Sequence, residues 1–121
     1  MISKEKPQDI HERIYKFVVD VLNFIKTLPK TPQNLIIINQ ISRSVTSMGA
    51  NDQEADGTDS RKDFIAKYCI VRKEGKETNY WLRLIEDTNK IANGLESNYL
   101  KQEGKEIVKI VSSIILKTKG N

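Results

Sequence analysis

SRKDFIAKYCIVRKEGKETNYWLRLIEDTNKIA, residues 60–92, decides the fold of this chain. Apolar or small residues recur in it at alternating steps of four and three, as on the buried seam of a helical bundle. These positions are Phe64, Tyr68, Val71, Gly75, Thr78, Leu82 and Ile85. One helix cannot bury such a seam alone, so the spacing predicts further helices packed against it. Gly75 and Thr78 predict that a neighbouring helix approaches closely at mid-seam.

Similar spacing in three other parts of the chain predicts three further helices. With the 60–92 helix, these are expected at about residues 8–28, 32–55 and 97–118. Thr31 followed by Pro32 is typical of an N-cap with proline at the first helical position, and Asn93-Gly94 is typical of a helix stop. The sequence therefore predicts an all-α, antiparallel, up-down-up-down four-helix bundle that forms one domain over residues 1–121.

Composition and charge favour a soluble protein of the cytoplasm. The 121 residues include 20 basic and 16 acidic ones, and the net charge of +4 permits an anionic partner without requiring one. Cys69 is the only cysteine, which excludes an intrachain disulfide and fits a reducing compartment. No apolar run approaches the roughly 20 residues of a membrane span, and residues 1–7 lack the apolar segment of a secretory signal. We expect no membrane partner.

Residues 52–63, DQEADGTDSRKD, match the pattern of a twelve-residue calcium loop. Oxygen-bearing side chains stand at positions one, three, five, nine and twelve, and Gly57 stands at position six. Asp63 at position twelve is shorter than the usual glutamate, and Asp59 replaces the usual apolar residue at position eight. The alternative interpretation is an acidic turn between two helices, with Ser60 as the cap of the second. The residues leave both interpretations open.

Glu54, Glu74 and Glu77 form a candidate carboxylate cluster on two predicted helices. Paired carboxylates serve acid-base chemistry or hold two metal ions in a bundle. A di-iron site also needs Glu-x-x-His pairs, whereas the only histidine, His11, lies near the N-terminus and is expected on the surface. We therefore expect the glutamates to pair with a base such as Arg43, with no enzyme activity, metal or cofactor. A metal-dependent enzyme using the three glutamates is the alternative.

Two stripes of basic residues follow predicted helix faces. One consists of Arg72, Lys76, Arg83 and Lys90, and the other of Lys101, Lys105 and Lys109. Each has the charge and spacing to contact nucleic-acid phosphates. The alternative is an ordinary solvated face, because Glu86, Asp87 and Glu106 interrupt the stripes. Repetition of the stripes around a ring of subunits would favour nucleic-acid binding.

Several blocks of the sequence resemble one small protein family. They are QISRSVTSMGAN (40–51), SRKDFIAK (60–67), ETNYWL (77–82) and KIVSSII (109–115). These blocks are similar to those of the four-helix-bundle proteins encoded in intervening sequences of bacterial 23S rRNA genes. The accessory variability determinants of diversity-generating retroelements are related to that family. The resemblance spans nearly the whole chain.

The resemblance implies a four-helix protomer that assembles into a ring-like homopentamer. In the retroelement relatives the barrel binds nucleic acid and a reverse transcriptase. The resemblance also implies a polar network that defines fold and assembly without catalysis, in which residues of the second helix face residues of the third. The network consists of Arg43, Ser47, Asn51 and Glu54 on one side and Glu74, Glu77, Tyr80 and Trp81 on the other.

Two functional hypotheses follow from the sequence and the resemblance together. The leading one is a non-enzymatic, pentameric protein that associates with RNA or DNA through its basic faces, with salt-sensitive and weakly sequence-selective binding. The alternative is an interaction adaptor or scaffold that docks a protein partner such as a reverse transcriptase.

Overall fold

A computed structural model describes residues 9–90 and 94–120 of the chain. Over these residues it has four helices and no strands. The helices are α1 (Ile10–Ile25), α2 (Pro32–Ala55), α3 (Arg61–Thr88) and α4 (Gly94–Gly120). The expected all-α class and the four helices are therefore confirmed. Within residues 9–90 and 94–120, no helix combines the length and apolar character that a membrane span requires.

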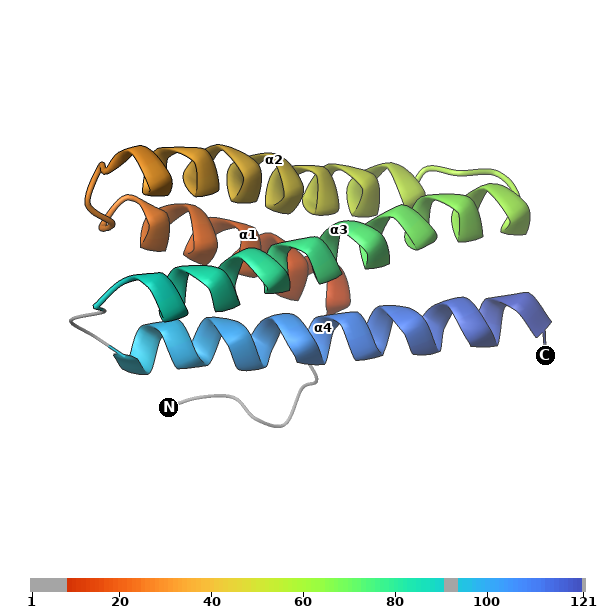
Figure 1. Ribbon diagram of the computed structural model, residues 1–121. Coiled ribbons are helices and arrows are strands. Elements are labelled where there is room, and N and C mark those ends of the chain that lie inside the picture. The colour runs from red at the N-terminus through yellow and green to blue at the C-terminus, as the bar shows by residue number, and fades with distance from the viewer. Residues whose placement is uncertain (1–8, 91–93, 121) are drawn as a thin grey trace.

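The four helices lie side by side along one common direction (Figure 1). α2 packs against α3 and α3 against α4, while the shorter α1 packs against both α2 and α4. In Figure 1 the connection between α1 and α2 and the facing ends of α3 and α4 lie at the left, and the α2–α3 connection lies at the right. Residues on the inner faces of all four helices form one core.

Caps start two of the helices where the sequence predicts them. The Thr31 hydroxyl accepts a hydrogen bond from the Asn34 amide at 3.1 Å, with Pro32 in the first turn of α2. The Ser60 hydroxyl accepts one from the Asp63 amide at 3.0 Å. Each cap satisfies a backbone N–H that has no partner inside its helix.

α2 ends at Ala55 as predicted, whereas several other helix ends differ from the predicted bounds. α1 ends at Ile25 and not at residue 28, because the residue before Pro29 is disfavoured in the helical conformation and the chain turns there. α3 ends at Thr88 and not at 92, since Asn89 adopts an extended backbone. α4 begins at Gly94, three residues before the predicted start, and continues to Gly120. The predicted start at residue 8 and the stop at Asn93 lie outside the described residues.

The seam of α3 lies in the core as its spacing predicts, with Tyr68, Val71 and Ile85 fully buried. Close helix packing occurs at the small seam residues. A Cβ on Gly75 would lie 3.0 Å from Val108 Cγ2 of α4, and one on Gly104 would lie 3.1 Å from Phe17 Cζ of α1. Side chains at these two glycines would therefore push the helices apart.

Candidate functional site

The two basic stripes meet in one groove between α3 and α4, hereafter the α3–α4 groove. Its volume is about 630 Å³. The lining residues are Lys76, Asn79, Tyr80, Arg83, Glu86 and Asp87 from α3, with Lys101 and Lys105 from α4. Four of these side chains are basic and two are acidic, so the groove has an excess of positive charge. The stripes converge because α3 and α4 pack along their length.

The cations of the α3–α4 groove differ in their availability. Lys101 is half-buried and forms an ion pair with Glu86 across the two helices. Lys76, Arg83 and Lys105 are exposed, and within the described parts of the chain none of them has a carboxylate within ion-pair distance. These three side chains are therefore the ones free to contact an anion.

The remaining predicted basic residues lie outside the α3–α4 groove. Arg72 is half-buried one turn from Cys69, and its Nη2 lies 3.9 Å from the sulfur. Lys90 and Lys109 are exposed but do not line the groove. The structure thus brings together four of the seven predicted residues.

Part of the predicted polar network joins α2 to α3. Arg43 reaches from α2 to both glutamates, with Nη1 3.3 Å from Glu74 Oε1 and Nη2 paired with Glu77 Oε2. The indole N–H of Trp81 donates to Glu77 Oε2 at 3.0 Å. Glu74 is buried, 7% exposed, so its carboxylate depends on the guanidinium for charge compensation.

The other predicted members of the network lie apart from this cluster. The Asn51 amide donates to the Ser47 carbonyl within α2, at 2.9 Å. Glu54 is exposed and pairs with Lys67 at 2.7 Å. The Tyr80 ring is exposed and contacts the Trp81 ring edge-to-face, with centroids 4.9 Å apart. Glu54 therefore does not join Glu74 and Glu77 in a carboxylate cluster.

Hydrogen bonding sets the ionisation of Glu77. The bonds from the Trp81 indole and the Arg43 guanidinium hold the pKa of Glu77 below its usual value of 4.5, against the opposing effect of partial burial. Glu77 is therefore ionised at neutral pH and acts as an acceptor that fixes Trp81.

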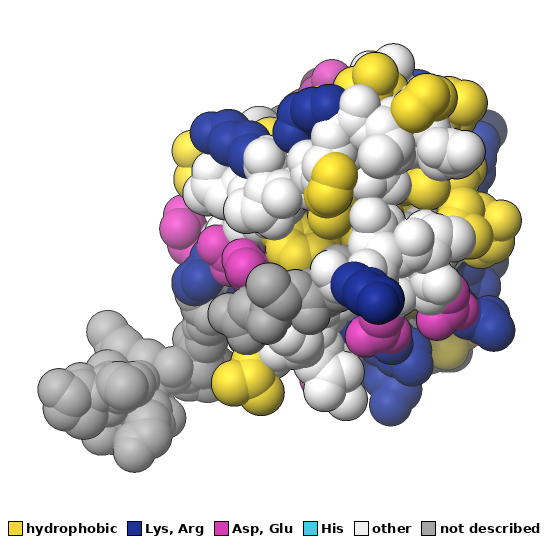
Figure 2. Space-filling model, turned by 60° about the vertical axis from the view of Figure 1, so that its left-hand side comes forward, with side chains coloured by type: hydrophobic (Ala, Val, Ile, Leu, Met, Phe, Trp, Pro, Cys, Tyr) yellow, Lys and Arg dark blue, Asp and Glu magenta, His cyan; other side chains and the backbone are white. Residues whose placement is uncertain are grey.

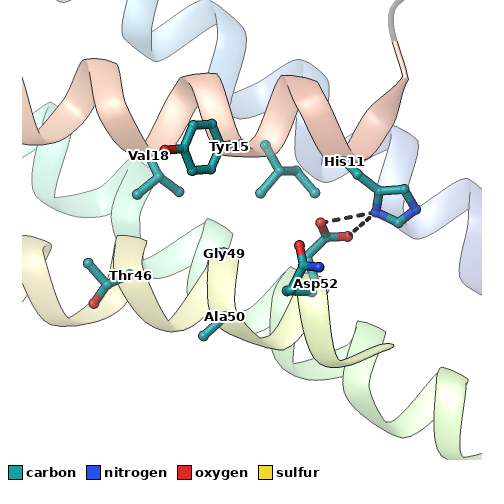
Figure 3. A pocket seen from close by; sticks show the side chains of 9 residues that line it. His11, Tyr15, Val18, Thr46, Gly49, Ala50 and Asp52 are labelled. Atoms are coloured by element: carbon teal, nitrogen blue, oxygen red, sulfur yellow. Dashed lines mark hydrogen bonds and ion pairs between the residues drawn. The ribbon is translucent and has the colours of Figure 1, made fainter. Parts of the chain in front are cut away.

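A second cluster, His11, Asp52 and Tyr68, connects three helices. The Tyr68 hydroxyl donates to Asp52 Oδ1 at 2.6 Å, and His11 Nδ1 lies 2.9 and 3.1 Å from the two Asp52 oxygens (Figure 3). Asp52 is only 3% exposed, whereas 34% of the His11 side chain is accessible, so the expectation of a surface histidine holds only in part. The cluster fastens the N-terminal end of α1 to α2 and α3.

Both hydrogen-bond partners of Asp52 have raised pKa values. Partial burial lowers the pKa of His11, but the hydrogen bond to Asp52 and the charges of Asp52, Asp9 and Asp56 outweigh it, so the pKa lies above 6.5. Burial, with the charge and hydrogen bond of Asp52, raises the pKa of Tyr68 far above 10. Tyr68 therefore remains a hydroxyl donor to Asp52.

The spacing of α2 residues indicates that Asp52 is buried, although an acidic residue is not normally expected in a core. Ile41, Val45 and Met48 lie at seam spacing on α2, and the next step of four reaches Asp52. A carboxylate at a seam position predicts a buried acceptor that needs donors from neighbouring helices. Tyr68 on the α3 seam supplies one, because buried tyrosine hydroxyls normally find a partner.

The positions of residues 52–63 argue against a calcium loop. Asp52 lies inside α2, its carboxylate engaged by His11 and Tyr68, and Ser60 caps α3. Among residues 9–90 and 94–120, no three His, Cys, Asp or Glu residues gather so that they could hold a metal ion. The segment is a helix end, a short turn and a helix start.

An apolar groove lies between α2 and α3, near the end of the bundle that Figure 2 brings forward. Ile36, Ile37, Trp81 and Leu84 line it, and Ile36 is 65% exposed. Asn34 and Asn89 lie at its edge and bond through their side-chain amides at 2.9 and 3.1 Å. Figure 2 shows exposed apolar side chains beside charged ones of both signs at this end. The groove is suited to contact with protein.

A smaller hollow of about 290 Å³ lies between α1 and α2 (Figure 3). Its lining includes Tyr15 and Val18 of α1 and Thr46, Gly49 and Ala50 of α2. A Cβ on Gly49 would lie 3.0 Å from Val18 Cγ2, so the glycine permits the close packing that its place in the sequence predicts.

The protein is therefore a small all-α helical bundle, with four helices around a shared core and two polar clusters between helices. The chain belongs to the 23S rRNA-intervening sequence protein family, whose model matches residues 6–113. It is similar to a crystal structure of a protein with unknown function from the S23 ribosomal protein family from Bacteroides thetaiotaomicron VPI-5482. That chain is 36% identical, the alignment covers 88% of this chain and 98% of that one, and the TM-score is 0.79. No match was found among curated proteins.

Proposed function

We propose that this protein is a non-enzymatic, oligomeric protein that associates with nucleic acid through the α3–α4 groove. The observation that carries the proposal is the convergence of Lys76, Arg83 and Lys105, from two helices, on one groove without neutralising partners among the described residues. Phosphate oxygens are the anions that such a row of cations contacts in nucleic acids. Binding is expected to be salt-sensitive and weakly selective for sequence.

The proposed protomer is an antiparallel up-down-up-down bundle, and five copies form a ring in the cytoplasm. Repetition around a ring would place five α3–α4 grooves on one assembly, which strengthens binding by multivalency. The sequence resemblance supports this proposal, because it implies retroelement relatives that assemble into rings.

A charge-reversal pair tests the proposed nucleic-acid contact. The variant Lys76→Glu/Lys105→Glu is compared with Lys62→Glu/Lys117→Glu, which makes the same change in net charge at exposed positions outside the groove of the same two helices. Binding to fluorescein-labelled 12-mer oligonucleotides is followed by anisotropy at 50 mM salt. We expect the groove variant to lose binding and the control to retain most of it. No binding by the wild-type protein, with its oligomeric mass intact, would overturn the proposal.

The apolar α2–α3 groove favours a second candidate function, docking of another protein. Ile36 in this groove is 65% exposed, and apolar exposure of this kind marks protein contacts. The occupant is a neighbouring copy in the ring or a partner such as a reverse transcriptase. Light scattering gives the mass of the assembly formed by Ile36→Glu, with Ser113→Glu at an exposed position as control, and so distinguishes the two occupants. A lower mass identifies a subunit contact, and an unchanged mass with loss of a co-purified protein identifies a partner contact.

A further inference from the structure

Tyr80 lies in the α3–α4 groove with a cation on either side of it. It is 56% exposed, and it follows Lys76 by four residues and precedes Arg83 by three. At a rise of 1.5 Å per residue, the two cations are spaced about 10 Å apart along the helix axis. Lys105 lines the groove from the α4 side. The groove therefore combines an open aromatic ring with flanking positive charges.

The Tyr80 ring is supported by a chain of contacts that reaches across two helices. Trp81 contacts it edge-to-face, at an interplanar angle of 72°. The Trp81 indole is in turn fixed by its bond to Glu77, and Glu77 pairs with Arg43 of α2. A ring held in this way loses little conformational entropy when a ligand packs against it. The polar network thus positions Tyr80 without touching the ligand.

We propose that Tyr80 is a stacking platform for an unpaired base, so that the α3–α4 groove takes single-stranded nucleic acid. The flanking phosphates contact Lys76, Arg83 and Lys105. A duplex keeps its bases stacked inside and presents mainly phosphates, which gives Tyr80 nothing to stack on. Single strands offer base faces, and aromatic side chains beside cations bind them with little dependence on sequence. This inference rests on the proposed function and adds the strandedness of the ligand.

Tyrosine variants test the stacking platform on the full chain. Tyr80→Leu removes the ring but keeps apolar bulk, and Tyr80→Phe keeps the ring. Tyr15→Leu is the matched control, since Tyr15 is an exposed tyrosine of α1, 67% exposed, outside the α3–α4 groove. Affinities are measured for 12-mer single-stranded RNA, single-stranded DNA and a 12-base-pair RNA duplex.

Tyr80→Leu should weaken single-strand binding by about 5- to 150-fold, the effect of losing one stacked base. Tyr80→Phe and Tyr15→Leu should bind within about threefold of wild type. Binding of the duplex and the salt dependence should be unchanged in Tyr80→Leu, because the phosphate contacts remain. Trp81, the only tryptophan, should change its fluorescence when a single strand binds, since it contacts Tyr80.

The outcomes separate the stacking inference from the proposed function. Equal affinity for duplex and single strand, with no effect of Tyr80→Leu, would refute stacking and leave the basic groove as a phosphate site. Absence of binding to all three oligonucleotides would refute both proposals. Dependence on Tyr80 with either single-stranded RNA or DNA would support stacking.

Discussion

Replacing Asp52 by Asn tests whether a buried carboxylate holds the proton on His11. Asp52 is 3% exposed, and both of its oxygens lie within 3.1 Å of His11 Nδ1. Asparagine keeps the size of the side chain but removes the negative charge, so the main effect that raises the pKa of His11 is lost. The burial that lowers this pKa remains. We therefore expect the pKa of His11 to fall in Asp52→Asn.

His11 is the only histidine, so its ring protons report the pKa directly in an NMR titration. The pKa should lie above 6.5 in the wild type and lower in Asp52→Asn. Glu54→Gln is the control, because Glu54 is an exposed carboxylate of the same helix that pairs with Lys67 and not with His11. A wild-type pKa of 6.5 or less, or the same pKa in Asp52→Asn, would refute this reasoning.

The same interaction makes the stability of the protein depend on pH. Because the pKa of His11 is raised on folding, its stabilising effect is fully present below about pH 6.5 and is lost as the pH rises through the folded value. Partial exposure of His11 limits the size of this contribution. Urea unfolding should therefore show a larger loss of stability from His11→Gln at pH 5.5 than at pH 9. A difference that does not vary with pH would contradict the assignment.

Three further predictions concern the core and the α2–α3 network. Gly104→Ala should lower the free energy of unfolding by about 1–3 kcal/mol, because the new Cβ would clash with Asn79 Oδ1. Urea unfolding of Asn79→Ala/Gly104→Ala should show partial recovery. Arg43→Gln should lower the urea midpoint, since it leaves buried Glu74 without its cation, and adding Glu74→Gln should restore part of it. Glu77 stabilises the fold above pH 4.5 and loses this effect as the pH falls through its lowered pKa, so Glu77→Gln should show a smaller loss of stability in acid than wild type.

The sequence predicts the elements of this fold well where apolar spacing is regular. The α3 seam, the Thr31 and Ser60 caps and the close approach at Gly75 all follow from local patterns, because each depends on residues within one or two turns. The end of α3 depends instead on Asn34, which lies 55 residues from its partner Asn89. No local pattern contains such a pairing, so the sequence predicts a longer helix than the one observed.

The arrangement of the site's side chains also depends on contacts between residues far apart in sequence, which local patterns do not contain. The spacing places Lys76 and Lys105 on helix faces, but their convergence depends on how α3 rotates against α4. Acidic residues and Gly57 surround Asp52 in sequence, so local pattern leaves a calcium loop and an acidic turn open, whereas the fold turns Asp52 to Tyr68 and His11. Residue type groups Glu54 with Glu74, although Glu54 pairs with Lys67 at the C-terminal end of α2.

The salt dependence of single-strand binding tests the central claim, phosphate contact by three cations of the α3–α4 groove. Each contact contributes a slope of about −0.7 to log K against log salt concentration, so one groove engaging Lys76, Arg83 and Lys105 predicts a slope of about −2. The charge-removing variant Lys76→Gln/Lys105→Gln should reduce the slope to about −0.7, while Lys62→Gln/Lys117→Gln should leave it near −2. Equal slopes for the two variants would contradict the account.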